Sequence, residues 1–177
     1  MRKHQTRLGI AQAGALRQDI DLYRYVIFRC VECLYSPMID LARAQAQSLI
    51  AMRDRFLSRL VYQTYNGYVL SQFKKLEVDL RTRGTIKWKH AMHLIRLLLS
   101  GITILREGVV PVRVDHQRDR LLAIRDGAIS WDEVDAWRMA LHHELDVAYE
   151  RTALPEQPDY AAVDRFLVSA RRGMIDE

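Results

Sequence analysis

KWKHAMHLIRLLLSGITILR, residues 87–106, decides the fold, because its apolar residues recur at the spacing of an α-helix. Since an α-helix advances about 100° per residue, side chains three, four and seven positions apart share a face. Lys89, His93, Arg96 and Ser100 fall on one face of this predicted helix. The apolar residues of the opposite face are Ala91, Leu94, Ile95, Leu98, Ile102 and Leu105. The pattern therefore predicts a helix with one buried side and one side carrying a column of cationic and polar groups.

The same helical spacing continues over most of the chain and predicts an all-α fold. We expect further helices over residues 40–53, 58–81, 118–125, 130–152 and 159–172, which gives a bundle of about six helices. Gly108 is expected to end the basic helix, and Ser130 with Glu133 forms a capping box. Residues 22–34 are either a strand leading into a helix or a short helix, so a short strand remnant near the N-terminus is allowed. Residues 1–18 are predicted to be a flexible arm and residues 19–177 a single helical domain.

The charges are distributed unevenly along the chain, whose formal net charge is +5. Residues 53–106 hold 11 basic and three acidic side chains, whereas residues 107–177 hold nine basic and 15 acidic ones. A basic middle of this kind attracts a polyanion such as RNA or the phosphates of a nucleotide. The alternative is that the basic middle and the acidic last third pack against each other, and charge alone supports both readings equally.

Several other classes of protein are disfavoured by the composition. No apolar run reaches the roughly 18 residues of a membrane span, and the N-terminal segment is too polar for a signal peptide, so we expect a cytoplasmic protein with no membrane partner. Cys30 and Cys33 lack the further ligands of a zinc site and are interpreted as inert buried thiols. His142 and His143 are adjacent, so on a helix they point about 100° apart and cannot share an ion. We therefore expect no metal site.

The candidate phosphate-binding residues are Lys87, Lys89, His93 and Arg96, with His90 on the flank. Ammonium, imidazole and guanidinium groups in a column suit a phosphate or carboxylate ligand. The alternative is a solvated amphipathic helix, which has the same charge pattern.

The candidate base-contacting residues lie on the preceding predicted helix. Tyr65, Tyr68 and Gln72 share one sector of its surface, so the aromatic rings could stack on a base while Gln72 hydrogen-bonds its edge. The alternative, which the frequency of Tyr at helix–helix seams favours, is packing between helices.

Several motifs together resemble a known family. KWKHAMHLIRLLLSGITILREG (87–108), LLAIRDGAISWDEV (121–134) and LDVAYERTALPEQPD (145–159) resemble the C-terminal half of a bacterial and phage family. Its members are predicted nucleotidyltransferases of the DNA polymerase β superfamily, some encoded beside RNA ligases. LSRLVYQTYNGYVLSQFKKL (57–76) and LYSP (34–37) extend the resemblance, which covers most of residues 19–172. The resemblance implies a nucleotidyltransferase-family protein whose basic helix contacts a nucleotide or RNA phosphate.

One part of the superfamily pattern is missing from the sequence. The Gly-Ser pair followed by two carboxylates separated by one residue, which holds two metal ions, does not occur; by likeness, Asp19 or Asp21 corresponds at most to the third carboxylate. The resemblance therefore implies no catalysis by this chain alone, with Mg²⁺ and a nucleoside triphosphate used only if a separate chain supplies the catalytic half. The alternatives are a nucleic-acid-binding module and an interaction domain that forms a homodimer.

Overall fold

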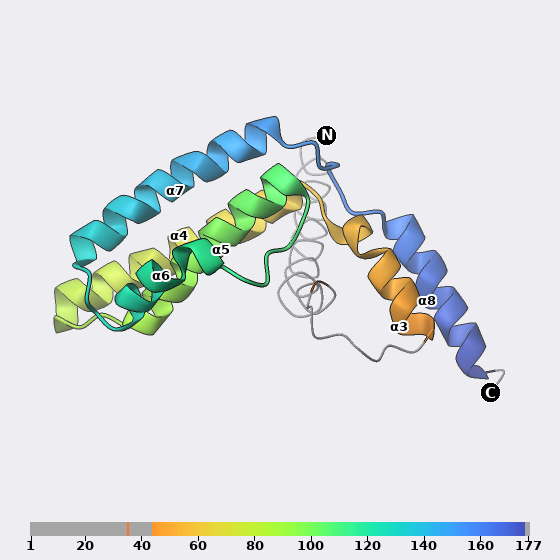
Figure 1. Cartoon of the computed structure of the whole chain (residues 1–177), viewed down its shortest axis with the longest axis horizontal. Coiled ribbons are helices and arrows are strands. Elements are labelled where there is room, and N and C mark those ends of the chain that lie inside the picture. The colour runs from red at the N-terminus through yellow and green to blue at the C-terminus, as the bar shows by residue number, and fades with distance from the viewer. Residues whose placement is uncertain (1–34, 36–43, 176–177) are drawn as a thin grey trace, which may run out of the picture.

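The computed structural model describes residue 35 and residues 44–175 of the chain, and all regular secondary structure in this part is helical (Figure 1). It contains six α-helices, two short 3₁₀-helices and no strand. The elements are α3 (Ala44–Ala51), η2 (Arg53–Phe56), α4 (Leu60–Arg83), α5 (Trp88–Glu107), η3 (Asp115–Gln117), α6 (Arg118–Arg125), α7 (Trp131–Arg151) and α8 (Tyr160–Ile175). The predicted all-α fold is confirmed. The expected arm, the expected strand remnant and both cysteines lie outside the described residues.

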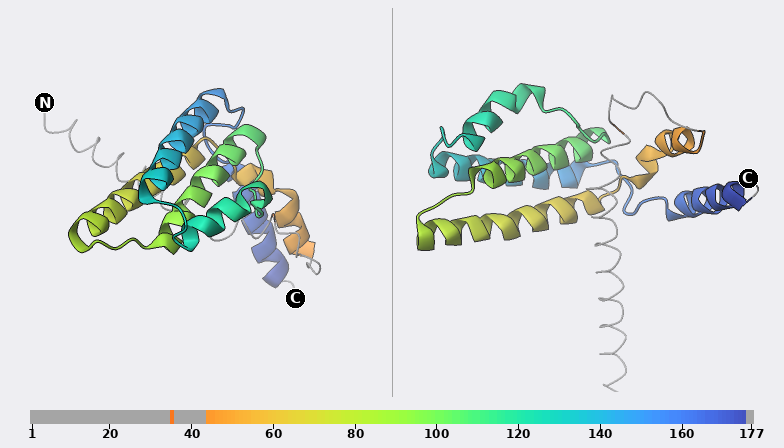
Figure 2. Two further views of the ribbon diagram at one scale, coloured as in Figure 1. Left: turned by 60° about the vertical axis from the view of Figure 1, so that its left-hand side comes forward. Right: turned by 90° about the horizontal axis from the view of Figure 1, so that it is seen from below.

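Helix α5 occupies the centre of the bundle and packs against α4, α6 and α7. Helices α4 and α6 run in the opposite direction to α5 and α7 (Figure 1). Helices α3 and α8 project together from one end of this bundle, as both views in Figure 2 show. The stretch of sequence with the strongest helical pattern is therefore the element around which the other helices are arranged.

The core forms where α4, α5 and α7 meet. Tyr65 and Phe73 of α4, Leu94 and Leu98 of α5 and Leu145 of α7 are at most 1% exposed. Full burial of such a side chain stabilises a fold by about 1.5–3 kcal/mol each.

None of the helices in the described part is long and apolar enough to cross a membrane.

The ends of the helices follow the sequence signals. The start of α3 lies four residues from its predicted position, and every other described end lies within three residues. Gly108 ends α5 with a left-handed φ of 66°, and its N–H donates to the Ile104 carbonyl at 2.9 Å. The capping box at the start of α7 is present, because the Ser130 hydroxyl accepts from the Glu133 N–H and the Glu133 carboxylate accepts from the Ser130 N–H. Local capping chemistry thus fixes where these helices begin and end.

Another helix approaches the chain closely at Gly101 but not at Gly67, the two glycines inside the long helices α5 and α4. No atom of a neighbouring residue lies within 4 Å of where a Cβ on Gly67 would be. A Cβ on Gly101 would lie 3.1 Å from Leu145 Cδ1 and 3.5 Å from Tyr65 Cβ. The missing side chain of Gly101 therefore lets α4 and α7 pack closely on α5.

Candidate functional site

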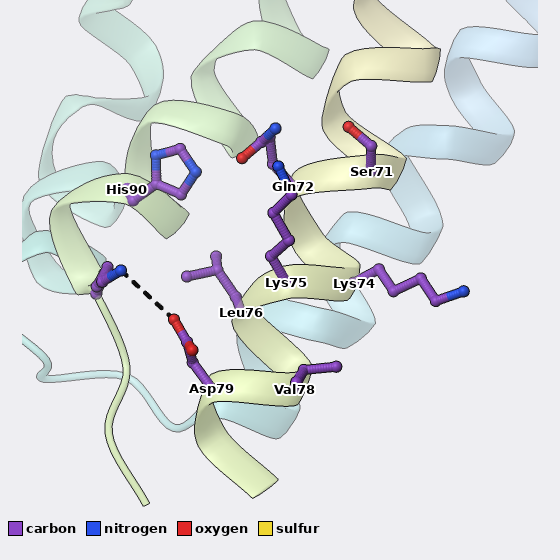
Figure 3. Close-up of a pocket in the computed structure, with 9 residues that line it drawn as sticks. Ser71, Gln72, Lys74, Lys75, Leu76, Val78, Asp79 and His90 are labelled. Carbon is purple, nitrogen blue, oxygen red and sulfur yellow. Dashed lines mark ion pairs between the residues drawn. The ribbon is translucent and has the colours of Figure 1, made fainter. Parts of the chain in front are cut away.

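A basic groove lies between the C-terminal half of α4 and the start of α5 (Figure 3). It has a volume of about 550 Å³, within the range typical of ligand-binding pockets. Its lining residues are Ser71, Gln72, Lys74, Lys75, Leu76, Val78, Asp79, Lys87 and His90. Four of them carry basic groups and one carries a carboxylate, so the groove suits a small anionic ligand or a segment of a polyanion.

The sequence of α4 places its polar residues along one row. Gln72, Lys75 and Asp79 are three and four positions apart, so they follow one another along a single face of the helix. Gly84 then ends α4 with a left-handed φ of 65°, and its N–H donates to the Leu80 carbonyl at 2.8 Å. This tight reversal brings the first residues of α5 alongside the last turns of α4.

Asp79 connects the two walls of the groove. Its carboxylate oxygens lie 3.4 Å from the Lys87 amine and 3.7 Å from an Arg83 guanidinium nitrogen. The Asp79 side chain is only 24% exposed, whereas those of Lys87 and Arg83 are 72% and 71% exposed. The carboxylate is therefore set into the wall, and the two cations remain accessible from outside.

Lys74 and Lys75 are exposed, and neither has an ion pair among the described residues. In Figure 3, Lys75 points into the space between the helices, whereas Lys74 extends away from α5. Lys75 is thus the cation of α4 that faces Lys87 and His90 most directly. A phosphate between them would meet positive charge from both helices.

His90 and His93 are both held toward the neutral form. Burial is the largest cause of the lowered pKa of His90, and the charges of Lys87 and Lys75 lower it further. Burial likewise lowers the pKa of His93, followed by the charge of Arg96 and by His90. An anion bound nearby would favour the protonated imidazoles and reverse these shifts.

The predicted column on α5 is only partly accessible. Lys89 and His93 are exposed and Arg96 is half-buried, but none of the three lines the groove. Ser100, which the helical spacing placed at the end of the column, is 2% exposed and belongs to the interior. Lys87 and His90 therefore line the groove, whereas Lys89, His93 and Arg96 lie outside it.

The predicted base-contacting residues separate into three environments. Tyr65 is fully buried against Gly101, so the expectation that it contacts a base is corrected: its ring fills the α4–α5 seam. Tyr68 is half-buried and packs against the hydrophobic core. Only Gln72 lines the groove.

Three charged lining residues were not predicted as site residues from the sequence: Lys74, Lys75 and Asp79. Lys74 and Lys75 were recognised only as part of the basic middle. The signal that could have found Lys75 and Asp79 is their helical register with Gln72. That signal becomes informative only once the packing shows which side of α4 faces α5.

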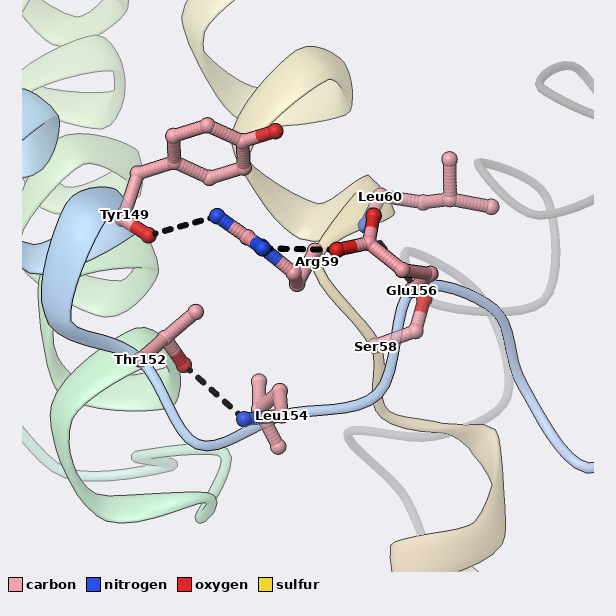
Figure 4. Close-up of polar contacts among 7 residues, drawn as sticks. All are labelled: Ser58, Arg59, Leu60, Tyr149, Thr152, Leu154 and Glu156. Carbon is pink, nitrogen blue, oxygen red and sulfur yellow. Dashed lines mark hydrogen bonds and ion pairs between the residues drawn. The ribbon is translucent and has the colours of Figure 1, made fainter.

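The N-terminal part of the basic middle is paired with the acidic last third of the chain (Figure 4). Arg59 donates to Glu156 Oε1 at 2.6 Å and to the Tyr149 carbonyl at 3.2 Å, and its guanidinium lies 4.5 Å from the centre of the Tyr149 ring. Arg55 pairs with Asp159 at 3.2 Å. The reading in which the basic middle packs against the acidic last third thus holds for these two arginines, which fix the α7–α8 connection to η2 and to the start of α4.

The described part of the chain brings no three His, Cys, Asp or Glu side chains together in a way that could hold a metal ion. Asp19 and Asp21, the candidates for a third catalytic carboxylate, lie outside the described residues.

A family model described as "RNA repair pathway DNA polymerase beta family" matches residues 28–169, which is more than half of the 177-residue chain. Neither the curated proteins nor the solved structures contain a match to the chain.

Proposed function

Because the chain belongs to the RNA repair pathway DNA polymerase beta family, we propose that its helical domain binds the phosphate of a nucleotide or RNA in the groove between α4 and α5. The observation that carries the proposal is the convergence of Lys75, Lys87 and His90 from two helices on one groove. Fixed cations of this kind stabilise phosphate oxygens both in a bound ligand and during nucleotidyl transfer.

Two features of the site support a phosphate rather than a carboxylate-bearing peptide or an apolar ligand. The cations stand on both walls, so they can contact several oxygens of one phosphate or two neighbouring phosphates. Gln72 adds an amide that can donate to and accept from a base edge or a ribose hydroxyl.

The proposal assigns binding, and no independent transfer reaction, to the chain. The Gly-Ser and paired-carboxylate motif of the superfamily is absent from the sequence. We therefore propose that a separate chain supplies the catalytic half, and that Mg²⁺ and a nucleoside triphosphate are used by the assembled pair. The cytoplasm is the location we propose for this activity.

The test is a titration of the purified protein with ATP and with tRNA, each with and without Mg²⁺, in about 50 mM salt. We expect binding that weakens steeply as salt is raised, because ion release drives phosphate recognition. The Lys75→Ala/Lys87→Ala variant should bind roughly tenfold more weakly. The matched control is Arg118→Ala/Arg165→Ala, which removes the same charge from two exposed residues outside the groove.

The ATP and tRNA arms of the titration distinguish the two sources of phosphate. Tighter binding of ATP identifies a nucleotide site, and tighter binding of tRNA identifies an RNA site. Equal losses in the groove variant and the control, or no binding of either ligand by the unmodified protein, would overturn the proposal.

A further inference from the structure

Asp79 is the one acidic residue among those that line the groove, and it pairs with one of the groove's cations. Its carboxylate lies 3.4 Å from the Lys87 amine, the same group that a phosphate in the groove would contact. Because Asp79 is set into the wall and Lys87 is largely exposed, the amine can turn from the carboxylate to a ligand while Asp79 stays in place.

We infer that Asp79 competes with the phosphate ligand for Lys87 and so determines how strongly the groove discriminates between ligands of different charge. The inference rests on the proposed function, and it assigns to that site a specificity-determining residue. When the groove is empty, Asp79 neutralises part of its positive charge and holds Lys87 toward α4. When a phosphate binds, Lys87 exchanges one anionic partner for another.

The physical consequence follows from the carboxylate's charge. Asp79 repels a bound anion in proportion to the anion's charge, whereas it leaves a neutral ligand unaffected. Removing the Asp79 charge should therefore strengthen binding, and the gain in affinity should be larger for ligands that carry more negative charges. If Asp79 served only to join α4 to α5, its loss would alter the binding of charged and neutral ligands alike.

The experiment measures the affinities of adenosine, 3′,5′-cyclic AMP, AMP and ADP for the full chain at pH 8, in 50 mM salt with EDTA. These probes share one base and ribose and carry zero to three negative charges, so differences among them report charge. Asp79→Asn keeps the size of the side chain and removes its charge. Glu77→Gln is the matched control, because it removes a carboxylate from the same helix at a position that does not line the groove.

In Asp79→Asn we expect affinity to rise by roughly threefold for cyclic AMP and roughly tenfold for AMP, with adenosine unchanged. Glu77→Gln should give a distinctly smaller rise. An equal change for all four probes, or weaker binding of AMP than in the unmodified protein, would overturn the inference. Circular dichroism checks that the variant is folded, and Asp79→Ser, which also removes the charge, takes its place if it is not.

The outcomes separate this inference from the proposed function. If the unmodified protein binds AMP no better than adenosine, the groove is not a phosphate site and the proposed function fails. If it prefers AMP, and Lys75→Ala/Lys87→Ala abolishes that preference while Asp79→Asn leaves it unchanged, only the role of Asp79 fails.

Discussion

Gly101 of α5 lies directly against Leu145 of α7, with 3.1 Å between the Leu145 Cδ1 atom and the place where a Cβ on residue 101 would be. Because Tyr65 of α4 contacts the same point, three helices meet at a residue with no side chain. The position of α4 relative to α5, and with it the shape of the basic groove, depends on this contact.

We predict opposite effects of alanine at the two mid-helix glycines. Gly101→Ala should destabilise the protein by about 1 kcal/mol, because the crowding of Leu145 exceeds the gain in helix propensity. Gly67→Ala should stabilise it by up to about 1 kcal/mol, since nothing lies near the added methyl group. Urea denaturation of both variants measures the difference, and a stabilising Gly101→Ala would contradict the packing described here.

Arg59 is predicted to contribute more to stability than its ion pair suggests. It donates to the carbonyl of Tyr149 in the last turn of α7 and covers that residue's ring, in addition to pairing with Glu156. Arg59→Ala should therefore cost about 2 kcal/mol, whereas Glu156→Gln should cost at most about 0.5 kcal/mol, because Glu156 is 75% exposed. Thermal and urea melts of the two variants test this ratio. Equal effects would show that the ion pair alone carries the contact.

Stability should fall as the pH is lowered from 7 toward 5. The pKa of His142 is lowered from its ordinary value of 6.5 mainly by burial and then by the charge of Arg138, with Asp146 and Asp135 opposing the shift. His90 and His93 are shifted in the same direction. The unfolded chain therefore binds more protons than the folded one below about pH 6.5, so acidification favours unfolding.

The measurement for this pH effect is the free energy of unfolding in urea at several values between pH 5 and 8. It should be nearly constant above pH 7 and decline below 6.5. His142→Gln should reduce the decline, because it removes one of the three groups. An unfolding free energy that rises on acidification would show that these three imidazoles are stabilised in their charged form.

The fold could be predicted from the sequence because its signals are local. The spacing of apolar residues over α5, Gly108 at its end and the Ser130–Glu133 capping box each act within a few positions of the chain. The groove could not be predicted in the same way. Whether Lys74 or Lys75 meets Lys87 across a groove depends on how α4 is rotated against α5, and that rotation is set by contacts such as Tyr65 on Gly101.

The predicted column shows the same limit. Helical spacing correctly places Lys89, His93 and Ser100 on one face of α5, yet Ser100 is buried and the two others are exposed. One face of a long helix can pass from solvent into the core, because its neighbours cover only part of its length. Periodicity reports which residues share a face, and it does not report what covers each turn of that face.

Phosphate binding should strengthen as the pH falls, if the groove is a phosphate site. The pKa of His90 is lowered by burial and by the charges of Lys87 and Lys75, so the free protein holds a neutral imidazole at pH 7.5. A bound phosphate raises that pKa again, so binding takes up a proton, and affinity rises as the pH decreases through the pKa of the complex.

A phosphodiester probe such as cyclic AMP is needed, because its own phosphate does not titrate in this range. Between pH 7.5 and 5.5 we expect its affinity to rise by roughly threefold in the unmodified protein and to change little in His90→Gln. His116→Gln is the matched control, because His116 is exposed and lies outside this groove. A rise of equal size in His90→Gln would mean that the proton is taken up elsewhere, and His90 would then not face the ligand.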